Sequence, residues 1–569
     1  ITRRDFINGT LMAAGASCVP SDSTGQGAMA ALDPAYYPPA LTGLRGSHPG
    51  SNLHAHGRAW SGQTDWGPTT ELSETYDLVV VGGGLSGLSA AYFYQQQHGT
   101  DKKILILDNH DDFGGHAKRN EFWHGDRMLL SHGGTINIQD FNQYGVPAQR
   151  LIRSLGITPE RYGDFADKDL YPSLGLSRGV FFGKETFGTE RLVTGEGEPS
   201  WQEYLARTPL STQARNDIAK LHRTRIDYLA GLSDSEKRDR LRAMSYQDYL
   251  VNLVGLKRES LVILQRDGYW AIGIDALSAW SAAGGGAPGT LGLGLYHEAK
   301  DERMYFRFPD GNASIARLLV RAMIPAVAPG STMQDIVTAR FDYAQLDRAE
   351  APVRVRLNST VIDVHHLGDP ASAREVETTY VEDGRARRVR AGQIILACYN
   401  SAIPYLCEEL PAEQKRALAQ SLKAPLVYTS VMISNWTSFA KLGVHRVHFP
   451  GGYFNDFRLS DPINIGDYRH AQSPQDPIIV NLYRTPLAPG LTAQAQWQAG
   501  RRDLLTTSFE SFERNVRDQL GRMLSAAGFD PARDIEAITV NRWPHGYAYG
   551  QNPSTGEIAY MLDEVPPQM

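Results

Sequence analysis

The chain has 569 residues, 42% hydrophobic and 21% charged, which is the composition of an ordinary soluble globular protein and is too long for a single core. A formal net charge of −6 gives no indication of nucleic-acid binding. It is compatible with a cationic substrate, although many enzymes that act on neutral substrates are equally acidic. No apolar run reaches about 18 residues, so no membrane span is expected. Three cysteines without a Cys-x-x-Cys pair exclude a disulfide framework and covalently attached haem.

The first twenty residues are predicted to be a leader. Arg3-Arg4-Asp5-Phe6 resembles a twin-arginine export signal and precedes a mildly apolar stretch. Residues 1–20 are therefore not expected to contribute to the fold, and the mature protein is expected in the periplasm. Residues 21–75 are rich in Pro, Gly, Ser and Ala and are predicted to form an extended arm over the surface.

The strongest motif follows the arm. An apolar run of strand type over residues 76–81 leads into Gly82-Gly83-Gly84-Leu85-Ser86-Gly87 and then into a helical pattern. Gly82 permits a tight turn, Gly84 lets the backbone approach a diphosphate, and Gly87 lets the helix pack on the strand. A second strand ends at Asp108, about 20 residues past the motif, where a ribose-binding carboxylate is expected. This order predicts a Rossmann-type dinucleotide site at the N-terminus of a helix.

Further landmarks resemble the FAD-dependent amine oxidases and their relatives. The stretch after the second strand, Phe113-Gly114-Gly115-His116-Ala117-Lys118-Arg119, resembles that family's segment, in which Gly114 and Gly115 would let backbone and cofactor meet closely. The resemblance continues through residues 308–323, a strand over 353–361 and a late strand over 394–398. It implies FAD as the cofactor, with the backbone of Val361 beside the adenine.

Other segments narrow the resemblance to the bacterial spermidine dehydrogenases, which are exported enzymes with FAD and b-type haem. These segments are residues 45–56 of the arm, residues 113–122, and Asn541-Arg542-Trp543-Pro544-His545-Gly546-Tyr547. The resemblance implies a non-covalent haem b with an axial histidine, which passes electrons from FAD to an external acceptor. The leading ligand candidates are His48 and His56, with His54 third and His116 an outside choice.

The expected fold class is α/β, with a Rossmann-type FAD-binding domain and an interleaved α+β substrate domain of amine-oxidase-like type. The FAD-binding segments are predicted at residues 76–150 and 303–400, and the substrate domain at residues 151–302 and 401–569. Amine-oxidase-like chains usually close on the flavin with a C-terminal Gly-Asp type of segment. None is found here, so either the tail is missing from this chain or FAD binding is weakened.

A polyamine is a flexible multivalent cation, so a tunnel with terminal carboxylates and aromatic walls is expected. The candidate substrate-binding residues are Trp270, Tyr453, Asp456, Trp543 and Tyr547. The candidate catalytic residue is His545, which as a neutral imidazole with a pKa near the operating pH could accept a proton from the amine. A role in shaping the pocket is an equal alternative.

The expected function is oxidation of spermidine at its secondary amine, giving an imine that hydrolyses to 1,3-diaminopropane and 4-aminobutyraldehyde. The residues alone predict a flavoprotein, whereas the polyamine and the haem are implied by the resemblance. The alternatives are a flavoenzyme for another amine or for C–C desaturation, and a non-catalytic flavin or polyamine binder. Acidic tunnel residues would favour an amine, and an all-apolar tunnel a desaturase. No nucleic-acid partner is expected, and a homodimer remains an option.

Overall fold

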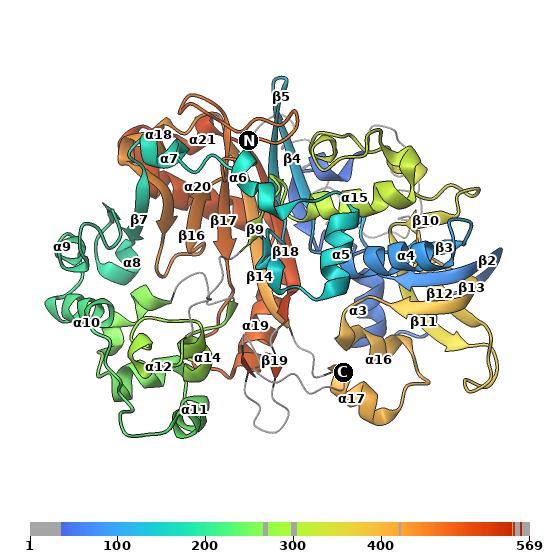
Figure 1. Ribbon diagram of the computed structural model, residues 1–569, viewed down its shortest axis with the longest axis horizontal. Coiled ribbons are helices and arrows are strands. Elements are labelled where there is room, and N and C mark those ends of the chain that lie inside the picture. The colour runs from blue at the N-terminus through green and yellow to red at the C-terminus, as the bar shows by residue number, and fades with distance from the viewer. Residues whose placement is uncertain are drawn as a thin grey trace.

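The computed structural model describes residues 36–265, 271–296, 304–419 and 423–548, with the backbone of Gly550–Gln551 and Ile558–Ala559. The predicted leader and Trp270 lie outside these residues. Within them, no helix has the length and apolar character needed to cross a membrane. Two large sheets stand next to each other and organise the rest of the chain (Figure 1).

A six-stranded sheet follows the order β10-β3-β2-β13-β12-β11. Its first four strands are parallel, and β12 and β11 continue the sheet antiparallel. The residues of β3 and the last four of β2 are fully buried, as their continuous apolar pattern predicts. The strands are β2 (Thr70–Val81), β3 (Ile104–Leu107), β10 (Val353–Arg356), β11 (Ser359–His366), β12 (Val376–Glu382) and β13 (Arg385–Leu396).

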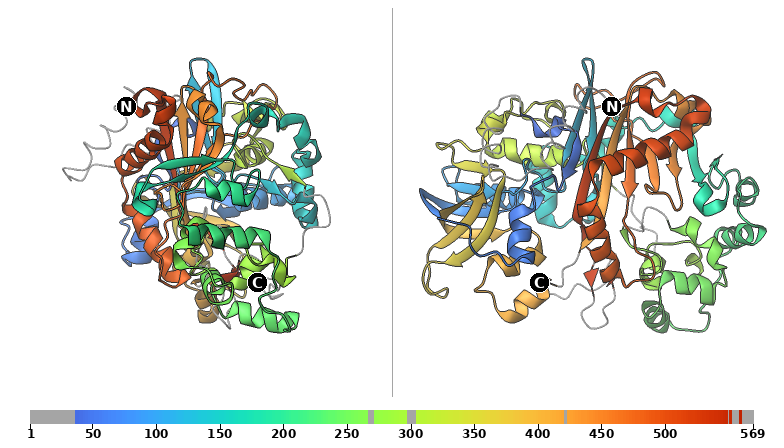
Figure 2. Two further views of the ribbon diagram at one scale, coloured as in Figure 1. Left: turned by 90° about the vertical axis from the view of Figure 1, so that its left-hand side faces the viewer. Right: turned by 180° about the vertical axis from the view of Figure 1, so that it is seen from behind.

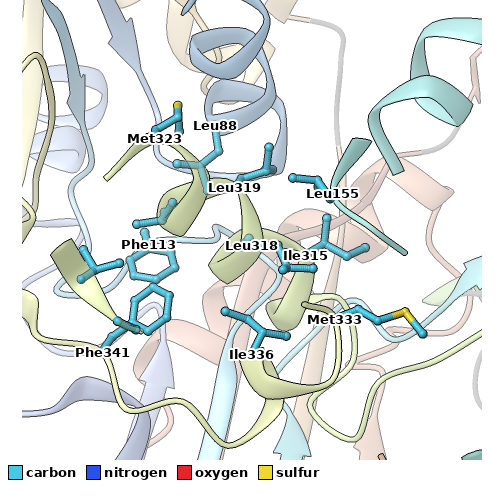
Figure 3. Close-up of a cluster of buried hydrophobic side chains, with 14 of the residues drawn as sticks. Leu88, Phe113, Leu155, Ile315, Leu318, Leu319, Met323, Met333, Ile336 and Phe341 are labelled. Atoms are coloured by element: carbon cyan, nitrogen blue, oxygen red, sulfur yellow. The ribbon is translucent and has the colours of Figure 1, made fainter. Parts of the chain in front are cut away.

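Helices α4 (Leu85–His98) and α15 (Ala313–Met323) pack together beside this sheet. Apolar residues recur every three or four positions along α15, and every residue of the helix except Ala322 is buried. Leu318 and Leu319 belong to the same cluster as Leu88 of α4 and Phe113 (Figure 3). This packing fixes the start of α4, which is where the glycine motif ends.

The second sheet has eight strands in the order β1-β18-β14-β17-β16-β15-β7-β8. Helices α19 (Ala493–Thr506) and α20 (Phe509–Leu524) pack against it. Its strands are β1 (Gly43–Gly46), β7 (Ser177–Phe182), β8 (Arg191–Thr194), β14 (Lys423–Ile433), β15 (Val444–His448), β16 (Asp456–Leu459), β17 (Ile478–Arg484) and β18 (Ile535–Ala548). Further elements are the hairpin β4 (Arg119–His124) and β5 (Arg127–His132), and helices α5 (Val146–Ser154), α9 (Trp201–Ala206), α10 (Thr212–Arg223), α11 (Asp234–Arg242), α14 (Ala279–Gly284), α16 (Ile403–Leu406), α17 (Ala412–Ala419) and α18 (Thr437–Leu442).

The predicted fold class is confirmed, since segments far apart in the sequence build a Rossmann-type sheet and a second α+β unit interrupts them. Two local predictions were wrong. The arm is not simply extended, because it forms β1 and the helix α3 (Leu53–Trp60). The strand expected over residues 353–361 is two strands, β10 and β11, separated at Asn358, where φ is 53°.

Candidate functional site

The glycine motif forms a tight loop between β2 and α4. Gly82 has a φ of 112°, and a Cβ there would lie 2.5 Å from the carbonyl oxygen of Ala397. A Cβ on Gly87 would lie 1.9 Å from the carbonyl oxygen of Gly82, so only glycine permits this approach of helix to strand. A Cβ on Gly84 would meet nothing closer than 3.6 Å. Gly84 therefore keeps open the space that a diphosphate would approach.

Gly114 and Gly115 face this motif from the loop after β3. The N–H of Gly114 donates to the carbonyl oxygen of Gly83 at 2.8 Å. A Cβ on Gly115 would lie 3.0 Å from the Cα of Gly84. The two glycine loops therefore lie against each other and present backbone without side chains, an arrangement that we call the cradle. A diphosphate, such as that of FAD, suits its backbone N–H groups.

Asp108 ends β3 and secures the cradle. Its Oδ2 accepts the N–H of Gly83 at 2.7 Å, and its Oδ1 accepts the N–H of His110 at 2.8 Å. Burial raises the pKa of this carboxyl. Each oxygen retains a further acceptor site, so a ribose hydroxyl can also donate to it. Val361 lies buried in β11, and its contact with the adenine stays a prediction.

A cavity of about 290 Å³ opens beside the cradle. His116, the residue after Gly115, forms part of its wall. Trp543 is held in place by donating its indole N–H to the carbonyl oxygen of Gly133 at 2.6 Å. Among the described residues, the lining is aromatic and amide-rich and contains no carboxylate: His116, Gly134, Thr135, Ile136, Asn137, Gln139, Asn312, Leu426, Tyr428, Trp543, Gly546, Tyr547 and Ala548.

The structure brings Trp543 and Tyr547 to this cavity, where the sequence predicted them. Tyr453 does not line this cavity: its ring packs against the hydrophobic cluster that contains Phe454 and Phe512, and the guanidinium of Arg484 lies 3.8 Å from its centroid. Trp270 lies outside the described residues. Sequence reasoning missed Tyr428, although its strand was recognised, because nothing in a local apolar run shows which side chain faces a cavity.

Asp456 was predicted to line the tunnel, and this was wrong. Its side chain is buried in β16 and pairs with Arg446 at 2.7 Å and with Arg458 at 3.5 Å. Arg458 lies two residues further along β16, and Arg446 is its cross-strand partner on β15. The carboxylate therefore stabilises the sheet and is not available to a cationic substrate.

His545 lies where the two sheets meet, with its ring 4.6 Å from that of Tyr399. Burial, followed by the charges of Arg501 and Lys423, lowers its pKa to about 3. This pKa lies below the value near the operating pH that the sequence led us to expect for a base. Such an imidazole is a weak base, and its catalytic role stays a prediction.

The described residues do not fit a haem at His48. The Nε2 of His48 accepts the N–H of Asp111 at 3.2 Å, and its Nδ1 donates to the carbonyl oxygen of Pro49 at 3.0 Å. Both ring nitrogens are therefore engaged. His56 stacks on Trp60 at 3.8 Å and lines neither the 290 Å³ cavity nor an open depression of about 870 Å³ near β8. No group of three metal-binding side chains occurs in the described part of the chain.

Comparison with known proteins establishes the Rossmann-type domain, since a family model for NAD(P)-binding Rossmann-like domains matches residues 80–155. Oxidoreductase PigB of Serratia sp. (strain ATCC 39006) is 31% identical over 86 residues, which are 15% of this chain and only 11% of that protein. Putrescine oxidase bound to putrescine is 14% identical, with a TM-score of 0.45 over 84% of this chain and 88% of that chain. Cyclohexylamine oxidase from Brevibacterium oxydans IH-35A is 14% identical, with a TM-score of 0.42 over 82% and 84%. Nothing about the substrate follows from similarities at this level.

Proposed function

We propose that this chain is an FAD-dependent dehydrogenase that oxidises spermidine at its secondary amine. The observation that carries the proposal is the cradle of Gly84 and Gly115 beside an aromatic cavity between the sheets. The cradle and Asp108 would hold the diphosphate and the ribose. FAD, when bound, supplies the acceptor for the two electrons and the hydrogen that leave the substrate.

The cavity residues would bind and orient the amine. Tyr428, Trp543 and Tyr547 present aromatic faces, which attract ammonium groups, and the amide oxygens of Asn137 and Gln139 can accept N–H bonds. Because an enclosed site disfavours a charged amine, it favours the neutral nitrogen from which oxidation proceeds. The resulting imine would react with water to give 1,3-diaminopropane and 4-aminobutyraldehyde.

The polyamine part of the proposal rests on the sequence resemblance. Electrons would pass to an external acceptor, and the twin-arginine leader supports a periplasmic reaction. No step is assigned to haem, because the described arm residues do not fit one at His48. One observation favours a second candidate function: since the part of the lining that the structure describes holds no carboxylate, the cavity also suits a monoamine or an uncharged substrate whose C–C bond is oxidised.

The test is to mix FAD-loaded protein with spermidine in the absence of oxygen. The proposal expects the flavin absorbance to bleach and 1,3-diaminopropane to form in equal amount to the flavin reduced. Parallel samples receive a monoamine or an apolar alkene. If a monoamine or an alkene bleaches the flavin and spermidine does not, the result supports the second candidate function. If no compound bleaches the flavin, the result indicates a protein that binds flavin without catalysis.

A further inference from the structure

Five basic side chains from different parts of the fold gather at the seam between the two sheets, three of them around the ring of Tyr399. They are His56 of α3, His116 after the cradle, Lys423 of β14, Arg501 of α19 and His545 of β18. The rings of His545 and His116 lie 4.6 and 5.9 Å from that of Tyr399, and the Nζ of Lys423 lies 5.4 Å from its centroid. The charges of the other four all lower the pKa of His545. Arg501 likewise lowers the pKa of His56, and Lys423 that of His116, in addition to burial. In the right-hand view of Figure 2, α3 and α19 lie at this seam.

No described carboxylate pairs with these groups. The Nε and one terminal nitrogen of Arg501 are buried without a hydrogen-bond partner, and burial lowers the pKa of both Arg501 and Lys423. Elsewhere the buried arginines have oxygen partners: Arg45 pairs with Asp111 at 2.7 Å, and Arg542 donates to the carbonyl oxygen of Ser47 at 2.8 Å. Donor groups of a cation that are buried without a partner are unfavourable, and a bound anion would supply the acceptors that Arg501 lacks.

The cluster adjoins the cradle through His116. This residue follows Gly115, and its Nε2 hydrogen-bonds the hydroxyl of Tyr399 at 3.2 Å. We propose that Lys423, Arg501 and the three histidines form a binding site for an oxyanion, a phosphate or carboxylate group. Two sources share this chemistry: the diphosphate of a dinucleotide in the cradle, and a separate small anion. Only the first source rests on the proposed function.

The site has two physical consequences. Its positive charge repels an ammonium group, so a polyamine would enter the cavity from another side. A bound anion would also favour protonation of His545, so anions would bind more tightly as the pH falls. The groups that face His545 in the described structure are Arg501, Lys423, His116 and His56 by charge and Tyr399 by its ring.

The test uses sulfate, whose charge is constant between pH 5 and pH 8, in calorimetric titrations of FAD-free and FAD-loaded protein. Wild-type protein is expected to bind sulfate more tightly at pH 5 than at pH 8. Arg501→Gln should weaken binding by roughly tenfold or more, and Arg501→Lys should recover part of the loss. Arg502→Gln, which removes the adjacent exposed arginine, is the matched control and should bind like wild type.

Sulfate binding that disappears on loading FAD would assign the site to the dinucleotide diphosphate, and binding that persists would assign it to a separate anion. Equal sulfate binding by Arg501→Gln, Arg502→Gln and wild-type protein would overturn the inference. FAD content and reduction by spermidine, measured on the same samples, report the proposed function independently.

Discussion

Gly84 and Gly87 lie three residues apart but limit the chain in different ways. A Cβ fits at Gly84 in the folded protein and collides with backbone at Gly87. Gly84→Ala should therefore fold normally and lose FAD affinity by roughly tenfold or more, since the added methyl group occupies the diphosphate's approach. Gly87→Ala should lower the free energy of unfolding by about 2 kcal/mol or more. Urea unfolding and FAD fluorescence titration measure the two effects.

The matched control is Gly145→Ala, where φ is −59° and the nearest atom to an added Cβ is 3.9 Å away. It should change neither quantity. If Gly84→Ala binds FAD as tightly as wild-type protein, the cradle is not the diphosphate site.

The pKa of His545 gives a second test at the residue scale. With a pKa of about 3, its imidazole should not titrate between pH 5 and pH 8 in FAD-free, sulfate-free protein. NMR of protein labelled with ¹³C in its histidine rings would show this, with His545→Asn identifying the signal. A midpoint near 6.5 for that signal would restore His545 as a base suited to neutral pH.

Local sequence was informative for the cradle and uninformative for the polar side chains. The roles of Gly87 and Asp108 could be predicted because they depend on the glycine motif and on the strands next to it, which the sequence shows directly. Asp456 and His545 owe their properties to Arg446, Arg501 and other groups that only the folded sheets bring near them. A carboxylate in a sequence cannot reveal whether the fold has already neutralised it.

At the scale of elements, a buried ion pair ties the arm to the loop that follows β3. Arg45 of β1 makes two hydrogen bonds, of 2.8 and 2.7 Å, to the carboxylate of Asp111. Arg45→Met leaves that buried carboxylate without its cation and should lower the free energy of unfolding by about 3–5 kcal/mol. Arg58→Met removes a pair with the exposed Glu408 and should lower it by less than about 1 kcal/mol. If urea unfolding gives a similar loss in the free energy of unfolding for both variants, the Arg45–Asp111 pair does not stabilise the fold.

The strands of the Rossmann-type sheet were predictable because buried parallel strands have continuous apolar sequences. The element β1 was not, since four residues at a sheet edge are stabilised by pairing with β18 and carry no pattern of their own. The short helix α3 has no buried residue, so the apolar periodicity that reveals a helix is absent from it.

At the scale of the whole molecule, several buried histidines should make the protein sensitive to acid. Burial lowers the pKa of each, to about 4 for His116 and His470. Below about pH 6.5 the unfolded chain binds protons that the native state does not, so stability falls as the pH falls, by up to about 1.4 kcal/mol per pH unit for each such histidine. The described histidines with the largest shifts are His110, His116, His132, His445, His470 and His545.

Urea unfolding at pH 7, 6 and 5 measures this dependence. His470→Gln should flatten it, whereas His98→Gln, at an exposed position of α4, should not. A free energy of unfolding that is the same at pH 7 and pH 5 would show that these histidines are accessible to protons in the native state.

The central claim is that the two glycine loops hold FAD. The most direct measurement is the absorption spectrum of the purified protein together with chromatography of the nucleotide that it releases on denaturation. Wild-type protein should show flavin absorbance and release one FAD per chain. The FAD content should be much lower in Gly84→Ala and equal to wild type in Gly145→Ala. Release of NAD(P) in place of FAD, or wild-type FAD content in Gly84→Ala, would contradict it.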